Sequence, residues 1–115
     1  MATRNENHAR IWKVIAQIPR GRVSTYGRVA ERAGFPRGAR LTAQALRAVP
    51  KNLQLPWHRV LNAQGRIAIP DGSPSRMRQR ELLEREGVTF VGGRVNLERF
   101  GWQTSLDAML WRPDD

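Results

Sequence analysis

The chain has 115 residues, which is enough for one domain with a modest hydrophobic core. Its 20 Lys and Arg residues outnumber 10 Asp and Glu residues, and the resulting net charge of +10 indicates a polyanionic partner. The absence of cysteine excludes disulfides, thiolate zinc sites and a thiol nucleophile, and no apolar run approaches the ~20 residues of a membrane span.

Three helices are predicted in the first half of the chain. Apolar residues recur at helical spacing over residues 7–18, which predicts an amphipathic helix. Ser24 or Thr25 can cap a second helix over residues 26–33, which a glycine follows. A third helix begins after a short Gly/Pro turn and stops at Pro50.

The second half mixes a helix with short extended segments. A small turn over residues 62–65 separates two short apolar segments, and a helix is predicted over residues 73–86, closed by a glycine. Two adjacent glycines between residues 88–91 and 94–97 predict a β-hairpin. Apolar residues in the tail, 100–115, predict a short covering helix.

These elements predict a winged helix-turn-helix. Two short helices joined by a tight turn, the second bearing arginines, are typical of a helix-turn-helix, which we place at about residues 24–50. The hairpin after the helix at 73–86 would be the wing. The fold class is therefore mainly α with small β hairpins, in a single domain over residues 1–115. Arginine dominates the charge, because Lys13 and Lys51 are the only lysines, and this favours nucleic acid over a membrane surface.

The most informative motif is Pro56-Trp57-His58-Arg59-Val60. It resembles the Pro-Cys-His-Arg-Val active-site motif of the O6-alkylguanine-DNA alkyltransferases, in which the cysteine thiolate accepts the alkyl group. Together with the preceding helix-turn-helix, the motif makes most of the chain, from about Ile11 to Leu97, similar to the DNA-binding domain of those enzymes. Tryptophan at the cysteine position makes it similar to the alkyltransferase-like proteins, which bind damaged DNA without transferring the alkyl group. An indole is a poor nucleophile, so the hypothesis is a lesion-binding pocket without catalysis.

The resemblance implies roles in the helix-turn-helix. Tyr26 matches the tyrosine that presses on the phosphate 3′ to the lesion and helps rotate the nucleotide out; the alternative is a core tyrosine. Arg40 matches the intercalating arginine, whose guanidinium can fill the gap left by an extruded base; the alternative is a phosphate contact. Arg37 and Arg47 are expected to contact phosphate. The small residues Ala39, Thr42, Ala43 and Ala45 are expected to let the third helix lie close to DNA, in the minor groove according to the resemblance.

The resemblance also implies a pocket, for which we expect Tyr26, Trp57, Val60, Arg66 and Ser73, with the loop over residues 65–73 lining its other side. Trp57 would form its wall, the alternative being a core tryptophan. Ser73 is a candidate together with Ser75, although Ser73 can instead cap the helix that follows. Arg76 and Arg78 are expected either to reach the lesion or a phosphate, or to form a solvated charged face.

His58 and Glu86 match the relay that activates the cysteine in the enzymes. Without a thiol the relay has no substrate, so we expect a structural pair. Arg59 is expected to brace the fold, and His8 to lie on the surface. The family asparagine before the active-site loop is replaced by Val49.

The leading hypothesis is a non-enzymatic sensor that flips O6-alkylguanine out of double-stranded DNA. The resemblance implies that it flags the lesion for nucleotide excision repair through UvrA. Two alternatives remain: an enzyme with altered base chemistry at His58 and Glu86, and a winged-helix transcription factor. We expect no cofactor, metal or membrane partner, a monomer, and a cytoplasmic location at the bacterial nucleoid, since the polar N-terminus lacks a secretory signal.

Overall fold

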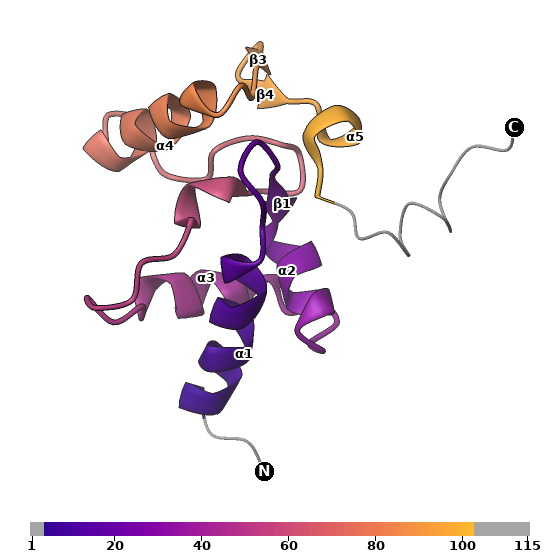
Figure 1. Cartoon of the computed structure of the whole chain (residues 1–115), viewed down its shortest axis with the longest axis vertical. Coiled ribbons are helices and arrows are strands. Elements are labelled where there is room, and N and C mark those ends of the chain that lie inside the picture. The colour runs from indigo at the N-terminus through magenta and orange to yellow at the C-terminus, as the bar shows by residue number, and fades with distance from the viewer. Residues whose placement is uncertain (1–3, 103–115) are drawn as a thin grey trace, which may run out of the picture.

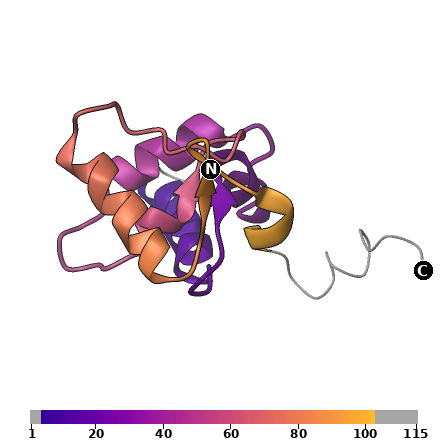
Figure 2. The same ribbon diagram turned by 90° about the horizontal axis from the view of Figure 1, so that it is seen from above.

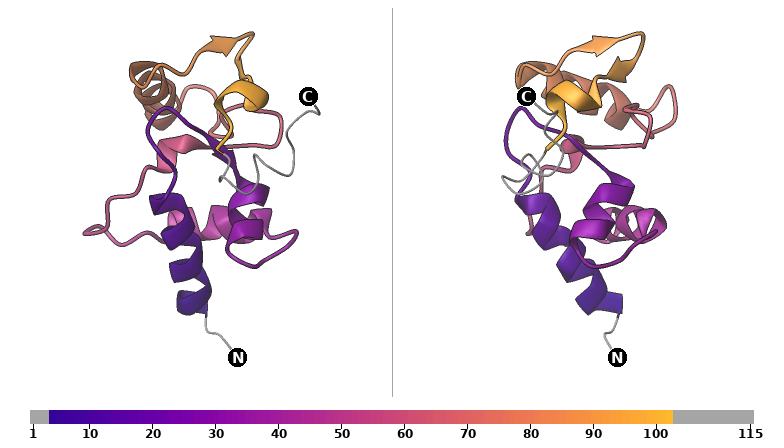
Figure 3. Two further views of the ribbon diagram at one scale, coloured as in Figure 1. Left: turned by 45° about the vertical axis from the view of Figure 1, so that its right-hand side comes forward. Right: turned by 90° about the vertical axis from the view of Figure 1, so that its right-hand side faces the viewer.

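The computed structural model describes residues 4–102, which fold into five helices and four short strands in two layers (Figure 1). In chain order the elements are α1 (Arg4–Ala16), β1 (Ser24–Thr25), α2 (Tyr26–Arg32), α3 (Ala39–Arg47), the 3-10 turn η1 (Trp57–Arg59), β2 (Val60–Leu61), α4 (Pro74–Arg85), β3 (Phe90–Val91), β4 (Arg94–Val95) and α5 (Leu97–Phe100). Figures 1 and 3 show α1–α3 in one layer and α4, the β3–β4 hairpin and α5 in the other. The mainly helical fold class is confirmed.

Helix α1 carries the first correction. His8 is only 4% exposed, so the prediction that it lies on the surface is wrong. The physical reason is its spacing: it precedes Ile11 and Ile15 by three and seven positions and so shares their buried stripe. The adjoining Trp12 donates its indole N–H to the Ala45 carbonyl over 2.7 Å, which fixes α1 against the end of α3.

Helices α2 and α3 form the predicted helix-turn-helix. Thr25 is the N-cap of α2, and its hydroxyl accepts from the Arg28 amide over 3.2 Å. Gly34 follows the helix with φ +93°, a left-handed conformation that suits glycine. The Thr42 hydroxyl of α3 donates to the Tyr26 carbonyl over 2.8 Å, which ties the two helices together where α2 begins.

A parallel pairing of β1 with β2 connects the two halves of the chain. Ser24 pairs with Val60 and Thr25 with Leu61. The apolar segment after the 62–65 turn forms no strand, although Asn62 donates to the Arg66 carbonyl across the turn over 3.0 Å. Because the two strands run parallel, the start of α2 lies beside the end of β2, whereas the turn that carries Trp57 precedes β2.

The C-terminal layer follows the predicted pattern with shorter strands. Ser73 caps α4, and β3 and β4 pair with Phe90 opposite Val95. The prediction of a strand up to Leu97 is wrong, because the Asn96 side chain accepts from two following amides and starts α5 instead. Seen from above, α4 and α5 lie on either side of the hairpin (Figure 2). The helix predicted in the tail lies outside the described residues.

Each layer has its own apolar core. The first, under α1–α3, is centred on Ile11, Ile15 and Val29; the second, under α4 and the hairpin, on Leu61, Leu83 and Val88. The β1–β2 pair joins them, since Val60 belongs to the first core and Leu61 to the second. Among the described helices, none combines the length and hydropathy that crossing a bilayer requires.

Candidate nucleic-acid interface

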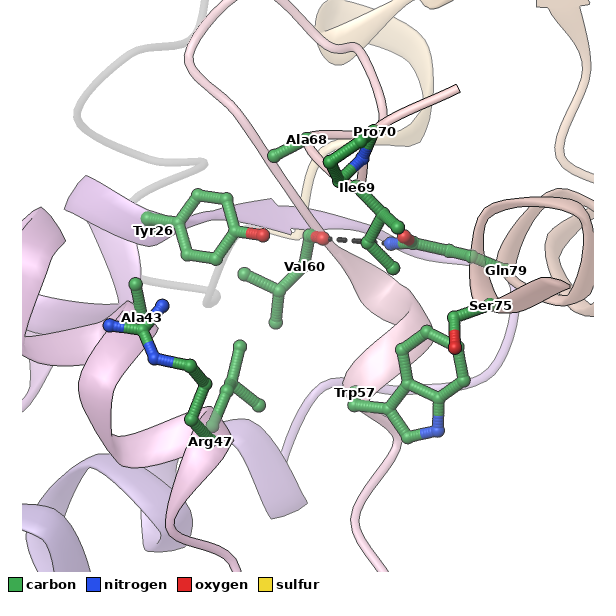
Figure 4. Close-up of a pocket in the computed structure, with 11 residues that line it drawn as sticks. Tyr26, Ala43, Arg47, Trp57, Val60, Ala68, Ile69, Pro70, Ser75 and Gln79 are labelled. Atoms are coloured by element: carbon green, nitrogen blue, oxygen red, sulfur yellow. Dashed lines mark hydrogen bonds between the residues drawn. The ribbon is translucent and has the colours of Figure 1, made fainter. Parts of the chain in front are cut away.

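A cavity of about 620 Å³ opens between the helix-turn-helix and the segment that leads into α4 (Figure 4). Helices α2 and α3 form one wall, η1 and β2 the floor, and residues 68–70 with the start of α4 the other wall. The lining residues are Tyr26, Ala43, Leu46, Arg47, Trp57, Val60, Ala68, Ile69, Pro70, Ser75 and Gln79. The lining is mostly apolar, and Arg47 is the charged residue in it.

Tyr26 starts α2 and points its phenol ring into the cavity (Figure 4). The ring is half-buried and also packs against the first core, so the functional and core interpretations describe the same placement. Burial raises the pKa of the Tyr26 hydroxyl above 10.0, and the nearby Arg47 guanidinium opposes that rise. Tyr26 therefore presents a neutral hydroxyl at physiological pH.

Arg47 lies on the same wall, although the sequence suggested only a phosphate contact for it. Its position is four residues, or about one turn, after Ala43, which also lines the cavity. This helical spacing is the signal that sequence reasoning missed. Arg47 thus places a cation beside Tyr26 at the edge of the cavity.

Three arginine side chains around α3 have no hydrogen-bond or ion-pair partner among residues 4–102, whereas Arg32 of α2 donates to the Trp102 carbonyl. Arg37, Arg40 and Arg47 are exposed, and none makes a hydrogen bond or ion pair within this range. By contrast, Arg59 and Arg76 are bound to carboxylates and backbone carbonyls. The helix-turn-helix therefore presents guanidinium groups that remain available to phosphates.

Thr42 is a correction to the expected DNA-facing set. It is fully buried, with 0% exposure, because its hydroxyl is used to hold the Tyr26 carbonyl. Ala43, one position further, does face the cavity. Ala45 is fully buried as well, so the expectation is wrong for Thr42 and Ala45, while Ala43 lines the open side of α3.

Trp57 begins η1 and forms the end of the cavity away from Tyr26 (Figure 4). The ring of His58 meets its indole edge-on, with centroids 6.1 Å apart and planes at 85°. Trp57 is partly buried and lines the cavity, so it is a wall residue and not part of either core. The indole offers an aromatic face and a single N–H donor.

His58 and Glu86 form a pair, as predicted. His58 Nε2 lies 2.7 Å from Glu86 Oε2, with side-chain exposures of 12% and 5%. Arg59 donates to the same carboxylate, at 2.8 Å from Nη2, and to the Ile18 carbonyl at 2.8 Å from Nη1. The Gly21 amide adds a further donor at 2.9 Å. Burial opposes ionisation of Glu86, but these donors outweigh it and lower its pKa to about 2.

Two predicted pocket residues lie elsewhere. The Arg66 side chain donates to the Gly92 carbonyl over 3.3 Å, so it lies against the β3–β4 hairpin and not in the cavity. Ser73 is the N-cap of α4, the alternative considered for it, while Ser75 lines the cavity.

Arg76 donates hydrogen bonds to the Ile67 and Ile69 carbonyls, which orders the loop beside the cavity. The loop over residues 65–73 does line the cavity, as expected, through Ala68, Ile69 and Pro70. Gln79 was not predicted, since nothing in its local sequence indicates that α4 borders the cavity at that position.

The fold and the site together define a class: a winged helix-turn-helix DNA-binding domain with a cavity beside its recognition helix. No group of three or more His, Cys, Asp or Glu residues within 4–102 is placed to hold a metal. The acceptor position is occupied by Trp57, and the full sequence has no cysteine, so alkyl transfer to a thiol cannot occur.

Comparison with known proteins agrees with this class. A family model described as the DNA-binding domain of 6-O-methylguanine DNA methyltransferase matches residues 6–88. The "DNA base-flipping protein" of Escherichia coli is 45% identical over 94 residues, which cover 81% of this chain and 71% of that protein. "Alkyltransferase-like protein 1" of Schizosaccharomyces pombe is 36% identical over 104 residues, covering 86% and 96%.

Solved structures show the same relationship. The S. pombe Atl1 structure in complex with damaged DNA containing O6-carboxymethylguanine superposes with a TM-score of 0.80 at 34% identity, covering 90% of this chain and all of that one. Mycobacterium tuberculosis OGT in complex with DNA gives 0.62 at 34% identity, over 75% of this chain but 51% of that one. The chain belongs to the family of the 6-O-methylguanine DNA methyltransferase DNA-binding domain, as one of its non-catalytic alkyltransferase-like members.

Proposed function

We propose that the protein binds O6-alkylguanine in double-stranded DNA by rotating the damaged nucleotide into the cavity, and that it leaves the lesion unchanged. The observation that carries this proposal is the position of Trp57 at the end of an open cavity that Tyr26 and Arg47 also line. Two relatives support it: the E. coli protein is named a DNA base-flipping protein, and the S. pombe protein is seen bound to DNA that contains O6-carboxymethylguanine.

The roles proposed for individual residues follow from their placement. Tyr26 sits at the start of α2 with its ring at the cavity, where it can press against the backbone of the rotated nucleotide. Arg40, exposed near the start of α3, fills the gap that the nucleotide leaves. Arg37 and Arg47 neutralise phosphates beside it. Trp57 and Val60 contact the base and its alkyl group through apolar surface.

We propose further that the bound complex marks the lesion for nucleotide excision repair, with UvrA as the protein that recognises it. A protein that cannot remove the alkyl group protects the cell only if another activity excises the damage. We propose that the protein acts as a monomer. Its substrate is chromosomal DNA, so the proposed location is the bacterial nucleoid.

Two measurements on the purified protein test the proposal. Fluorescence anisotropy should show tighter binding to a duplex with O6-methylguanine than to the same duplex with guanine. Mass spectrometry of the recovered oligonucleotide should show the methyl group still in place. Equal affinities contradict lesion recognition, and a demethylated product contradicts the non-catalytic mechanism. UvrA added to the preformed complex should give a ternary complex. Failure to form this ternary complex contradicts only the proposed link to nucleotide excision repair.

A further inference from the structure

Gln79 is a buried polar side chain at the edge of the cavity, and its orientation is fixed. It is 2% exposed, and its Nε2 donates to the His58 carbonyl over 3.0 Å and to the Val60 carbonyl over 2.9 Å. Carbonyl oxygens only accept hydrogen bonds, so the nitrogen must face them and the amide cannot be flipped. Figure 4 shows the amide extending from α4 to the Val60 carbonyl beside Ile69.

The Oε1 atom of Gln79 has no donor among residues 4–102. Three polar side-chain atoms in this range are fully buried without a hydrogen-bond partner, namely Asn7 Oδ1, His8 Nε2 and Ser24 Oγ. Gln79 Oε1 is not one of these fully buried atoms. Gln79 Oε1 therefore keeps access to free space, and the cavity is the space that this residue borders. An acceptor held in this way is ready for a ligand's donor.

The other polar groups of the lining have different chemistry. Arg47 and the Trp57 indole only donate, and the hydroxyls of Tyr26 and Ser75 can do either. The His58 and Val60 carbonyls already accept from Gln79. Gln79 Oε1 is thus the acceptor-only side-chain atom of the lining that lacks a donor within the described residues.

We infer that Gln79 Oε1 accepts a hydrogen bond from the 2-amino group of the rotated base, and so selects guanine. Every O6-alkylguanine keeps this amino group, whereas adenine has none at that position. The apolar walls take the alkyl group, and Gln79 identifies the base that carries it. This inference rests on the proposed function, because it requires the base to enter the cavity.

The test compares duplexes with O6-methylguanine, O6-methylhypoxanthine and guanine at one position. O6-methylhypoxanthine keeps the methyl group and lacks only the 2-amino group. The wild-type protein should bind O6-methylguanine about tenfold more tightly than O6-methylhypoxanthine, the effect of one hydrogen bond whose loss leaves a buried acceptor unpaired. In Gln79→Met, which keeps length without an acceptor, this ratio should fall to about one.

Leu83→Ala is the matched control, because Leu83 is buried on the same helix and lies outside the cavity lining. It should weaken folding and keep the wild-type ratio. Equal wild-type binding of the two methylated duplexes overturns the inference without any variant, and so does an unchanged ratio in Gln79→Met. The comparison of O6-methylguanine with guanine reports separately on lesion recognition; if that preference is absent, the proposed function and this inference both fail.

Discussion

His58 Nε2 lies 2.7 Å from Glu86 Oε2, and because the sequence has no thiol for this pair to activate, we interpret it as a structural contact. The Glu86 carboxylate is ionised, with a pKa of about 2, so it only accepts and His58 Nε2 must donate to it. Arg59 and the Gly21 amide occupy the same carboxylate. The pair therefore joins η1, the α1–β1 turn and the end of α4 in one structural network below Trp57.

Glu86→Gln should lower the free energy of unfolding and should change the affinity for DNA little. The pKa of Glu86 is lowered in the folded state, so its contribution to stability is complete above pH ~4.5 and is lost as the pH falls toward 2. At neutral pH that contribution is on the order of 3 kcal/mol. Urea denaturation from pH 7 to pH 3 should show a steeper loss for the wild type than for Glu86→Gln; parallel curves would contradict the network.

Trp57→Ala should reduce lesion preference by about tenfold, because an aromatic contact with the base is worth ~1–3 kcal/mol. Affinity for undamaged DNA should change little, since Trp57 lines the cavity and carries no charge. Anisotropy titrations with damaged and undamaged duplexes measure both. Trp57→Phe serves as the control and should retain most of the preference. A uniform loss for both duplexes would argue for a packing role.

Arg40→Ala should weaken binding of the damaged duplex more than that of the undamaged one. Both complexes lose one positive charge near the DNA backbone. The complex with the rotated nucleotide also loses the side chain that fills the gap in the base stack. A base analogue that fluoresces when unstacked, placed opposite the lesion, should report less rotation. Arg85→Ala, at the far end of α4, is a control of equal charge and should leave rotation unchanged.

Arg37→Gly should have opposite effects on two quantities: it should raise the stability of the fold and lower the affinity for DNA. Arg37 adopts φ 63°, a left-handed conformation that costs a non-glycine residue energy, so glycine should stabilise the fold by about 0.5 kcal/mol. The same change removes an exposed cation, so affinity should fall equally for damaged and undamaged DNA. The slope of log K against log salt should become shallower by about 0.9 if Arg37 neutralises one phosphate. A variant that loses stability would contradict the strain argument.

The sequence alone determined the local elements and the family. Helical spacing, caps and glycines are signals between near neighbours, so the helix-turn-helix, α4 and the hairpin were predicted with small errors at their ends. The Pro56–Val60 motif with tryptophan in place of cysteine predicted a non-catalytic member. His8 shows the limit of this reasoning: its polarity suggested the surface, whereas its place on the apolar stripe decided its burial.

Only the tertiary structure decided which residues meet in the cavity. The parallel pairing of β1 with β2 joins positions 36 residues apart, and no local pattern specifies it. That pairing brings Tyr26 and Trp57 to opposite ends of one cavity, and packing of α4 on η1 brings Gln79 to the same space, while the Arg66 side chain bonds to the hairpin. Tyr26, Trp57 and Val60 were expected in the pocket through the family resemblance, and all three line it. Strand pairing and side-chain packing act between distant parts of the chain, so no local pattern indicated Gln79 or excluded Arg66.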